Sequence, residues 1–177
     1  MRIGQGYDVH KIKPGKGMVL GGITIECDYS IEAHSDGDII IHALIDSLLG
    51  AAAYGDLGTY FPVNDESIKD ISGSSMLSTV LEKLALDNYK IINVDITYVG
   101  QVPKLMPYRE LIRKNLSTTL GIDIENISCK ATTTDGLGFE GKLEGISCHC
   151  VVLLSLIHIS EPTRQEAISY AVFGLKK

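Results

Sequence analysis

The feature that most limits the possible folds is an apolar segment with helical spacing in the first third of the chain. Within residues 38–53, apolar side chains recur every three or four positions, at Ile41, Leu44, Ile45, Leu48 and Leu49. This period predicts an α-helix with one apolar face, which Gly50 and Gly55 weaken and then end. A similar stripe within residues 74–87 follows serines that can cap a helix, so a second helix is expected there.

The other regular patterns are those of β-strands. Between residues 92 and 98 apolar and polar side chains alternate, which is the period of a half-buried strand. Strands are also indicated at 1–9, on both sides of Gly21-Gly22 within 18–27, at 127–132 and at 146–154, with a third helix after Pro107. The predicted order is βββααβαββ. Because the strands are grouped, we expect an α+β fold in which about three helices cover one face of a mixed β-sheet.

Composition limits the number of domains and the class of partner. A length of 177 residues and a hydrophobic content of 45% suit one core, so we expect a single domain over residues 1–154. Residues 155–177 form an atypical C-terminal tail, which we interpret as non-native because it resembles a fused adapter sequence. A net charge of −6 argues against a nucleic-acid partner, whose backbone attracts clustered lysines and arginines.

Targeting signals and cysteine usage favour a cytoplasmic protein. The first ten residues have neither the apolar core of a signal peptide nor the character of a transit peptide. No uninterrupted apolar run approaches the roughly 20 residues that span a bilayer, so no membrane partner is expected. The four cysteines are sparse, and we interpret them as reduced and mostly buried thiols.

Three residues have the types and spacing of a metal site. Asp8 and His10 lie two positions apart in a predicted strand, so their side chains leave the same face. His42 lies on the first predicted helix, with Asp38 and Asp46 one turn away on either side. Two histidines and one aspartate form a plausible zinc set that leaves a fourth position for water or substrate. On spacing alone, the alternative that His42 is merely packed or exposed stays open.

Two polar segments could hold an anionic ligand. The run 34–38 precedes an apolar helix, where free N–H groups can bind an anion. Its serine and aspartates could equally serve only as helix caps. The segment 132–139 combines three threonines, Asp135 and flexible backbone, which suits a phosphate but is also ordinary for a strand end and a turn. Both alternatives stay open for both segments.

Seven motifs together carry a family resemblance. They are Gly6-Tyr7-Asp8-Val9-His10, Ala33-His34-Ser35-Asp36-Gly37-Asp38, His42-Ala43-Leu44, Gly55-Asp56-Leu57-Gly58, Phe61-Pro62, Lys130-Ala131-Thr132-Thr133-Thr134 and Gly136-Leu137-Gly138-Phe139. In this order, and over residues 1 to about 154, the chain resembles the 2-C-methyl-D-erythritol 2,4-cyclodiphosphate synthase family. The resemblance implies a homotrimeric phosphorus-oxygen lyase with active sites between subunits. It would convert 4-diphosphocytidyl-2-C-methyl-D-erythritol 2-phosphate to the cyclic diphosphate and CMP, in the non-mevalonate isoprenoid pathway.

The resemblance also implies cofactors and residue roles. Asp8, His10 and His42 would hold Zn²⁺ or another divalent transition metal, and Asp135 a second ion, Mg²⁺ or Mn²⁺. His34 and Thr133 would align and stabilise the transition state. The implied substrate-binding residues are Asp8, His10, His34, Ser35, Asp56, Gly58, Phe61, Asp65, Pro103, Lys104, Thr132, Thr133, Thr134, Asp135, Phe139 and Lys142.

The chain departs from the family pattern at four positions that matter for the site or its surroundings. Asp135 stands where glutamate is more common, and Lys142 replaces a common arginine, losing the planar fork that binds phosphate bidentately. Gln5 and Val63 replace a more usual histidine and aspartate. None of these changes removes an implied zinc ligand.

Two rival functions use the same residues differently. A zinc hydrolase would employ the same three ligands with a metal-activated water as nucleophile, and would release an uncyclised product. A non-catalytic binding module or trimer-forming protein would keep the fold without turnover. Product analysis separates these three functions.

Overall fold

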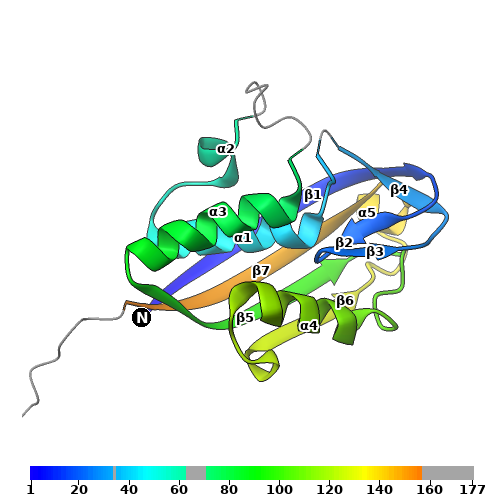
Figure 1. Ribbon diagram of the computed structural model, residues 1–177. Coiled ribbons are helices and arrows are strands. Elements are labelled where there is room, and N and C mark those ends of the chain that lie inside the picture. The colour runs from blue at the N-terminus through cyan, green and yellow to red at the C-terminus, as the bar shows by residue number, and fades with distance from the viewer. Residues whose placement is uncertain (34, 63–70, 157–177) are drawn as a thin grey trace, which may run out of the picture.

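The computed structural model describes residues 1–33, 35–62 and 71–156. Its elements run in the order β1 (Arg2–Pro14), β2 (Met18–Leu20), β3 (Ile23–Ile25), β4 (Tyr29–Glu32), α1 (Ile39–Ala52), α2 (Leu57–Tyr60), α3 (Gly73–Leu86), β5 (Tyr89–Val99), α4 (Arg109–Leu120), a 3-10 turn (Ile124–Asn126), β6 (Ile127–Thr132), α5 (Gly138–Gly141) and β7 (Gly145–Leu156). The three longer helices α1, α3 and α4 lie on one side of the strands (Figure 1). The expected α+β architecture is therefore confirmed.

One mixed sheet organises the molecule. Its five strands have the order β4-β1-β7-β5-β6, and β2 and β3 form a separate hairpin. The pair β5–β6 is parallel, and the other neighbours are antiparallel. The central pair β1–β7 is in continuous register from Arg2↔Leu154 to Lys11↔Gly145, so every side chain of β1 in this stretch has a fixed face.

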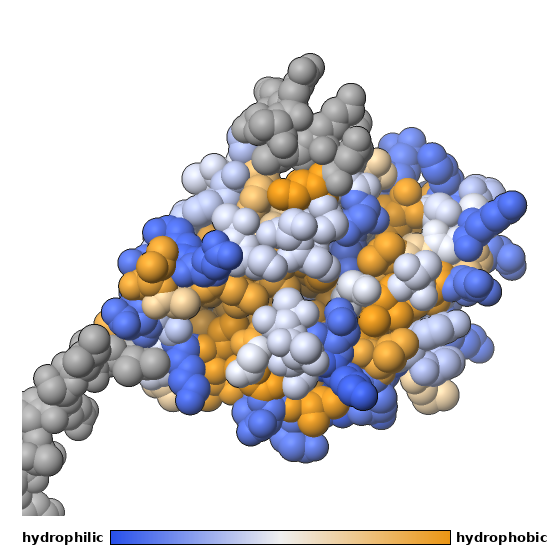
Figure 2. All heavy atoms as spheres, viewed as in Figure 1, coloured by the Kyte–Doolittle hydropathy of each residue, from blue (hydrophilic) through white to orange (hydrophobic). Residues whose placement is uncertain are grey.

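Helix α1 lies against β1 and β7 and under α3, which explains its composition. Of its fourteen residues, only Asp46 and Gly50 are not buried, because the sheet covers one side and α3 another. Seen from the helix side, hydrophobic residues also show at the surface between α3 and α4 (Figure 2). No helix among the described residues is both long and apolar enough to span a bilayer.

The opposite face of the sheet carries exposed apolar side chains. They come from the alternate positions of the two central strands: Ile3, Tyr7, Val9 and Val151 are 74%, 46%, 40% and 41% exposed. Tyr7 also packs against His149 of β7, with ring centroids 4.6 Å apart. This row, which we call the open face, is apolar enough to be a contact surface.

The structure differs from the sequence prediction mainly in short elements. β1 runs to Pro14 rather than ending at residue 9, because the unpredicted strand β4 pairs with its second half. The four-residue helices α2 and α5 were not expected, and α5 occupies part of the segment predicted as a loop. The third helix begins at Arg109, and Leu111 in its first turn is 52% exposed. β7 includes Leu156, and residues 157–177 of the tail lie outside the described residues.

Candidate metal centre

A capped helix start positions His42. The Asp38 carboxylate accepts hydrogen bonds from Ile40 N at 3.2 Å and Ile41 N at 3.1 Å, which fixes the first turn of α1. It also accepts from Gly21 N at 2.8 Å and Gly22 N at 2.6 Å, so the β2–β3 hairpin is bound to the same carboxylate. Of the alternatives for this polar run, Asp38 is therefore a cap, fully buried, rather than a side chain available to a ligand.

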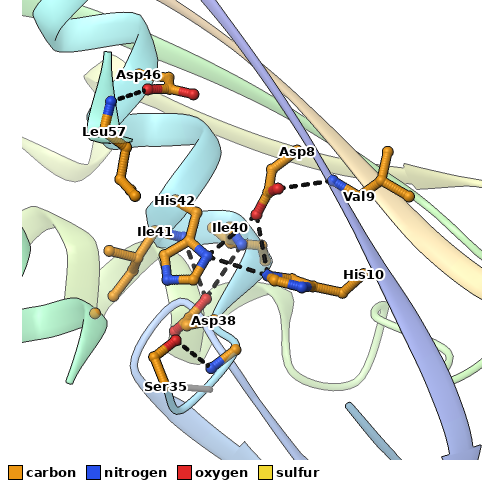
Figure 3. Close-up of polar contacts among 12 residues, drawn as sticks. Asp8, Val9, His10, Ser35, Asp38, Ile40, Ile41, His42, Asp46 and Leu57 are labelled. Carbon is orange, nitrogen blue, oxygen red and sulfur yellow. Dashed lines mark hydrogen bonds and ion pairs between the residues drawn. The ribbon is translucent and has the colours of Figure 1, made fainter. Parts of the chain in front are cut away.

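Three donor atoms converge where β1 passes α1 (Figure 3). Asp8 Oδ2, His10 Nε2 and His42 Nδ1 lie 3.1 Å from one another in each pairing. Metal–ligand bonds of 2.0–2.2 Å in tetrahedral geometry place ligand atoms about 3.3 Å apart. The triangle therefore already has close to the size that a divalent metal requires, and the three residues form a candidate metal site.

The electrostatics of the triad suit a cation. Burial opposes ionisation of Asp8, but hydrogen bonds and positive charge from His10 and His42 outweigh it and lower the pKa of Asp8. Burial likewise disfavours the imidazolium of His42, yet the hydrogen bond to Asp8 and its negative charge raise the pKa of His42. Without a metal, the cluster therefore favours the protonated form of His42 beside the Asp8 carboxylate, and a metal ion would compete with that proton.

Neighbouring groups fix the orientation of the ligands. Val9 N donates to Asp8 Oδ1 at 2.8 Å, which leaves Oδ2 turned toward the histidines. His42 Nε2 is buried and has no hydrogen-bond partner within residues 1–33, 35–62 and 71–156. With that nitrogen enclosed by protein, only Nδ1 of His42 faces the triad.

The segment after α1 lies beside the triad. Asp46, one turn beyond His42, accepts a hydrogen bond from Leu57 N at 2.7 Å (Figure 3). Asp56 caps α2 by accepting from Thr59 N and Thr59 Oγ1, both at 2.8 Å. The sequence had placed Asp46 on the face of His42 without giving it a contact. Its spacing of four from a metal ligand was the one available signal.

The other expected residues on this side occupy varied environments. Ser35 Oγ accepts from Gly37 N at 3.2 Å, Gly58 lies within α2, and Phe61 is buried at the end of that helix. His34 and Asp65 lie outside the described residues.

The remaining expected residues follow β5, end β6 or belong to the segment around α5. Pro103 and Lys104 line one wall of an open cleft of about 340 Å³, whose other wall is Glu26 to Tyr29. Thr132, Thr133 and Asp135 are exposed at and beyond the end of β6, Thr134 is half-buried beside them, and Phe139 packs against Gly145. Lys142 is exposed just after α5.

Strand register shows how the two groups are related within one chain. Val9, Ser147, Val99 and Thr132 are directly aligned across β1, β7, β5 and β6. Thr132 is thus three strand spacings, about 14 Å, from β1 and faces the side of Val9, opposite to Asp8 and His10. Within a single chain, Thr132 is therefore not beside the triad.

The chain is similar to proteins of one known family. The model of the YgbB family matches residues 1–155. The chain belongs to the YgbB family. A YgbB relative from Moorella thermoacetica, 2-C-methyl-D-erythritol 2,4-cyclodiphosphate synthase, is 49% identical over 154 residues, or 87% of this chain and 94% of the relative.

Solved YgbB-like structures have the same fold. The CDP complex of IspF from Plasmodium falciparum matches with a TM-score of 0.79 and 42% identity, over 89% of this chain and 97% of that one. The bifunctional IspDF from Campylobacter jejuni matches with a TM-score of 0.84 and 35% identity, over 88% of this chain and 42% of that one. The family resemblance expected from the sequence motifs is confirmed.

Proposed function

We propose that this YgbB chain is a 2-C-methyl-D-erythritol 2,4-cyclodiphosphate synthase of the non-mevalonate isoprenoid pathway. It converts 4-diphosphocytidyl-2-C-methyl-D-erythritol 2-phosphate to the cyclic diphosphate and releases CMP. The observation that carries the proposal is the metal-sized triangle of Asp8, His10 and His42, in a chain 49% identical to a protein of that name.

The chemistry needs positioning more than a protein nucleophile. The substrate's own 2-phosphate attacks the β-phosphorus, the bond to the CMP oxygen breaks, and CMP leaves with that electron pair. The chain must therefore bind both phosphates in line and exclude water. Bound Zn²⁺ at the triad, and Mg²⁺ or Mn²⁺ with Asp135 as a ligand, would supply charge neutralisation for the diphosphate.

Roles follow for the remaining residues. His34 and Thr133 align and stabilise the reacting phosphates, and Ser35, Asp56 and Gly58 hold the methylerythritol part. Pro103, Lys104 and the neighbouring threonines hold the nucleotide part, which is supported by relatives that bind CDP. The further substrate-binding residues are Phe61, Asp65, Thr132, Thr134, Asp135, Phe139 and Lys142.

The working unit is a homotrimer with active sites between subunits. Two observations support it: the open face presents exposed Ile3, Tyr7, Val9 and Val151, and Thr132 lies about 14 Å from β1 and on the opposite face to Asp8 and His10. Packing of a second copy on the open face buries the apolar row, and in the closed ring of copies the threonine segment of one chain is supplied to the triad of a neighbour.

A cytoplasmic location accompanies this function. All four cysteines are free thiols, and Cys129, Cys148 and Cys150 are buried. Burial also raises the pKa values of these three thiols, so they are unreactive. Such cysteines suit a reducing compartment.

Phosphorus NMR tests the proposal directly. Purified chain is incubated with the diphosphocytidyl substrate, Zn²⁺ and Mg²⁺, beside His42→Ala and the control Ser78→Ala, whose residue lies exposed on α3. We expect CMP and a cyclic diphosphate from the wild type and the control, and neither from His42→Ala.

Two other outcomes would contradict the synthase. CMP together with an uncyclised bisphosphate, carrying oxygen from ¹⁸O-labelled water, would identify a hydrolase. An unchanged spectrum from folded, zinc-loaded protein would identify a binding protein.

A further inference from the structure

Asp46 is placed unusually for a polar residue of α1. It is one of two residues in that helix that are not buried, and it lies one turn after the triad residue His42. Its Oδ1 accepts the hydrogen bond from Leu57 N at 2.7 Å, and this contact joins α1 to the first residue of α2 (Figure 3). The contact joins two residues that are eleven positions apart in the sequence.

The amide of Leu57 is a group that needs such a partner. The first N–H groups of a helix have no acceptor within the helix itself, and α2 has only four residues. Asp56 uses its carboxylate on Thr59, both at the backbone N–H and at the hydroxyl. Asp46 therefore satisfies from outside the helix an amide that the cap residue leaves free.

The path of the chain makes this hydrogen bond an anchor. The C-cap residue of α1 is Ala53, which has a left-handed backbone, and Tyr54 N donates back to Leu49 O. From there the chain returns along α1 by one to two turns before α2 begins at Leu57. The buried ring of Phe61 fixes the far end of this segment, and Asp46 fixes its near end.

Asp46 is not itself a member of the metal cluster. The group of possible ligand atoms within 4.8 Å of one another consists of Asp8, His10 and His42. One oxygen of Asp46 is occupied by Leu57 N. Burial raises the pKa of Asp46, the hydrogen bond from Leu57 opposes this, and the charges of Asp56 and Asp8 add to the rise. The Asp46 carboxylate thus interacts with the charge of Asp8 but is not a member of the metal cluster.

We infer that Asp46 is a positioning residue, whose hydrogen bond to Leu57 holds the α2 segment at a fixed place beside the metal triad. Asp56 and Gly58 belong to this segment, so Asp46 determines where the residues that hold the methylerythritol part stand relative to the metal. This inference rests on the proposed function for its consequence in catalysis. The anchor itself is a property of the folded chain.

Two substitutions separate the hydrogen bond from the charge. Asp46→Asn keeps an oxygen that can accept from Leu57 N but removes the negative charge, and Asp46→Ala removes both. Gly50→Ala is the matched control, because Gly50 is the other unburied position of α1 and, within the part of the chain that the structure describes, an added Cβ would meet only Gln5 O at 3.9 Å.

The first readout is steady-state kinetics with zinc content measured on the same samples. We expect Asp46→Ala to lower kcat/KM about tenfold, mainly through KM, the size expected for one lost hydrogen bond. Zinc content stays at the wild-type level, and Asp46→Asn and Gly50→Ala stay within about twofold of wild type. If Asp46→Asn is as impaired as Asp46→Ala, or if Asp46→Ala loses zinc, the positioning role is wrong.

The second readout does not depend on catalysis. Amide hydrogen exchange at Leu57 should be about tenfold faster in Asp46→Ala and unchanged in Asp46→Asn and Gly50→Ala. A wild-type chain without synthase activity would end the proposed function, and exchange at Leu57 would still decide whether the anchor exists. Unchanged exchange in Asp46→Ala would overturn the inference even in a fully active enzyme.

Discussion

Gly6 of β1 lies so close to Ala43 of α1 that a Cβ built on Gly6 would stand 2.0 Å from the Ala43 carbonyl oxygen. No side chain fits at this position unless the strand and helix move apart. Asp8 and His10 follow Gly6 on the same face of β1, and His42 precedes Ala43. The missing side chain of Gly6 is thus what allows the two ligand-bearing elements to approach.

Gly6→Ala should therefore weaken both the fold and the metal site. Forcing a methyl group into this contact destabilises the protein by about 1–3 kcal/mol, and zinc affinity falls because His42 moves away from Asp8 and His10. Urea denaturation and zinc titration measure the two effects. Gly50→Ala on the same helix should instead stabilise by up to about 1 kcal/mol, since alanine is the better helix former. Equal zinc affinity in Gly6→Ala and wild type would show that the close approach is not required.

Zinc affinity should fall as the pH falls through the histidine range. Asp8 raises the pKa of His42 above the usual value of about 6.5. As the pH falls, a proton therefore begins to compete with the metal at His42 at a higher pH than for a free histidine. The lowered pKa of Asp8 keeps that ligand ionised throughout this window. Competition titrations with a chromophoric chelator between pH 5.5 and about 8 should reveal proton release on binding. A pH-independent affinity would contradict the proposed ion pair.

Without metal, the pH dependence of stability should have the opposite sign. His42 has a raised pKa in the folded state, so its contribution is complete below the unfolded value of about 6.5 and is lost as the pH rises through the folded pKa. Asp8 has a lowered pKa, so its contribution is complete above about 3.9 and is lost as the pH falls. Chemical denaturation of metal-free protein should therefore show this contribution largest between these two values. In Asp8→Asn the maximum should flatten.

Asp38→Asn should destabilise the chain more than Asp36→Asn. Burial raises the pKa of Asp38 to about 6 against the opposing hydrogen bonds from Gly22, Gly21 and Ile41, so at pH 8 the group is ionised. An asparagine would place an NH₂ group against one of these N–H donors, at a cost of about 1.5–3 kcal/mol. Among the described residues, Asp36 accepts hydrogen bonds from Gly73 N and Asp38 N alone, and it is not fully buried. Denaturant midpoints at pH 8 compare the two variants.

Mixed oligomers should recover activity that neither parent has. His42→Ala lacks a metal ligand and Thr133→Ala lacks a residue that stabilises the reacting phosphates, so each variant alone is inactive. If each site joins two chains, random co-assembly at equal amounts gives about a quarter of sites with both intact residues. Activity of the co-refolded mixture measures this fraction. A mixture as inactive as its parents would place both residues in the same chain's site.

The longer elements could be predicted because each carries several periods of one pattern. α1 and α3 repeat their apolar spacing over fourteen residues, and β5 alternates over most of its length. β4 and α2 have four residues each, too few for a period to emerge. They exist because of partners elsewhere: β4 pairs with the second half of β1, and α2 is capped by Asp46 and Asp56.

The residues of the candidate site likewise divide into those that the sequence could predict and those that it could not. The strand period brings Asp8 and His10 to one face, and the family motifs add His42, so all three ligands could be proposed from the sequence. The role of Asp38 could not be decided there, because a helix cap and an anion-binding residue have the same local sequence. The Asp46–Leu57 contact depends on the return path of the chain after α1, which no periodic pattern encodes.

The uninterrupted register of β1 against β7 makes metal binding depend on strand alignment. Asp8 stands opposite Cys148 and His10 opposite Ile146. A slip of one residue would turn both side chains to the open face, away from His42, which stays on the helix. A metal ion that needs all three ligands therefore binds only the native alignment of the two strands, because a slip of one residue removes both Asp8 and His10 from the site. During folding, metal binding would stabilise the native strand register over registers shifted by one residue, because only the correctly aligned sheet can retain the ion.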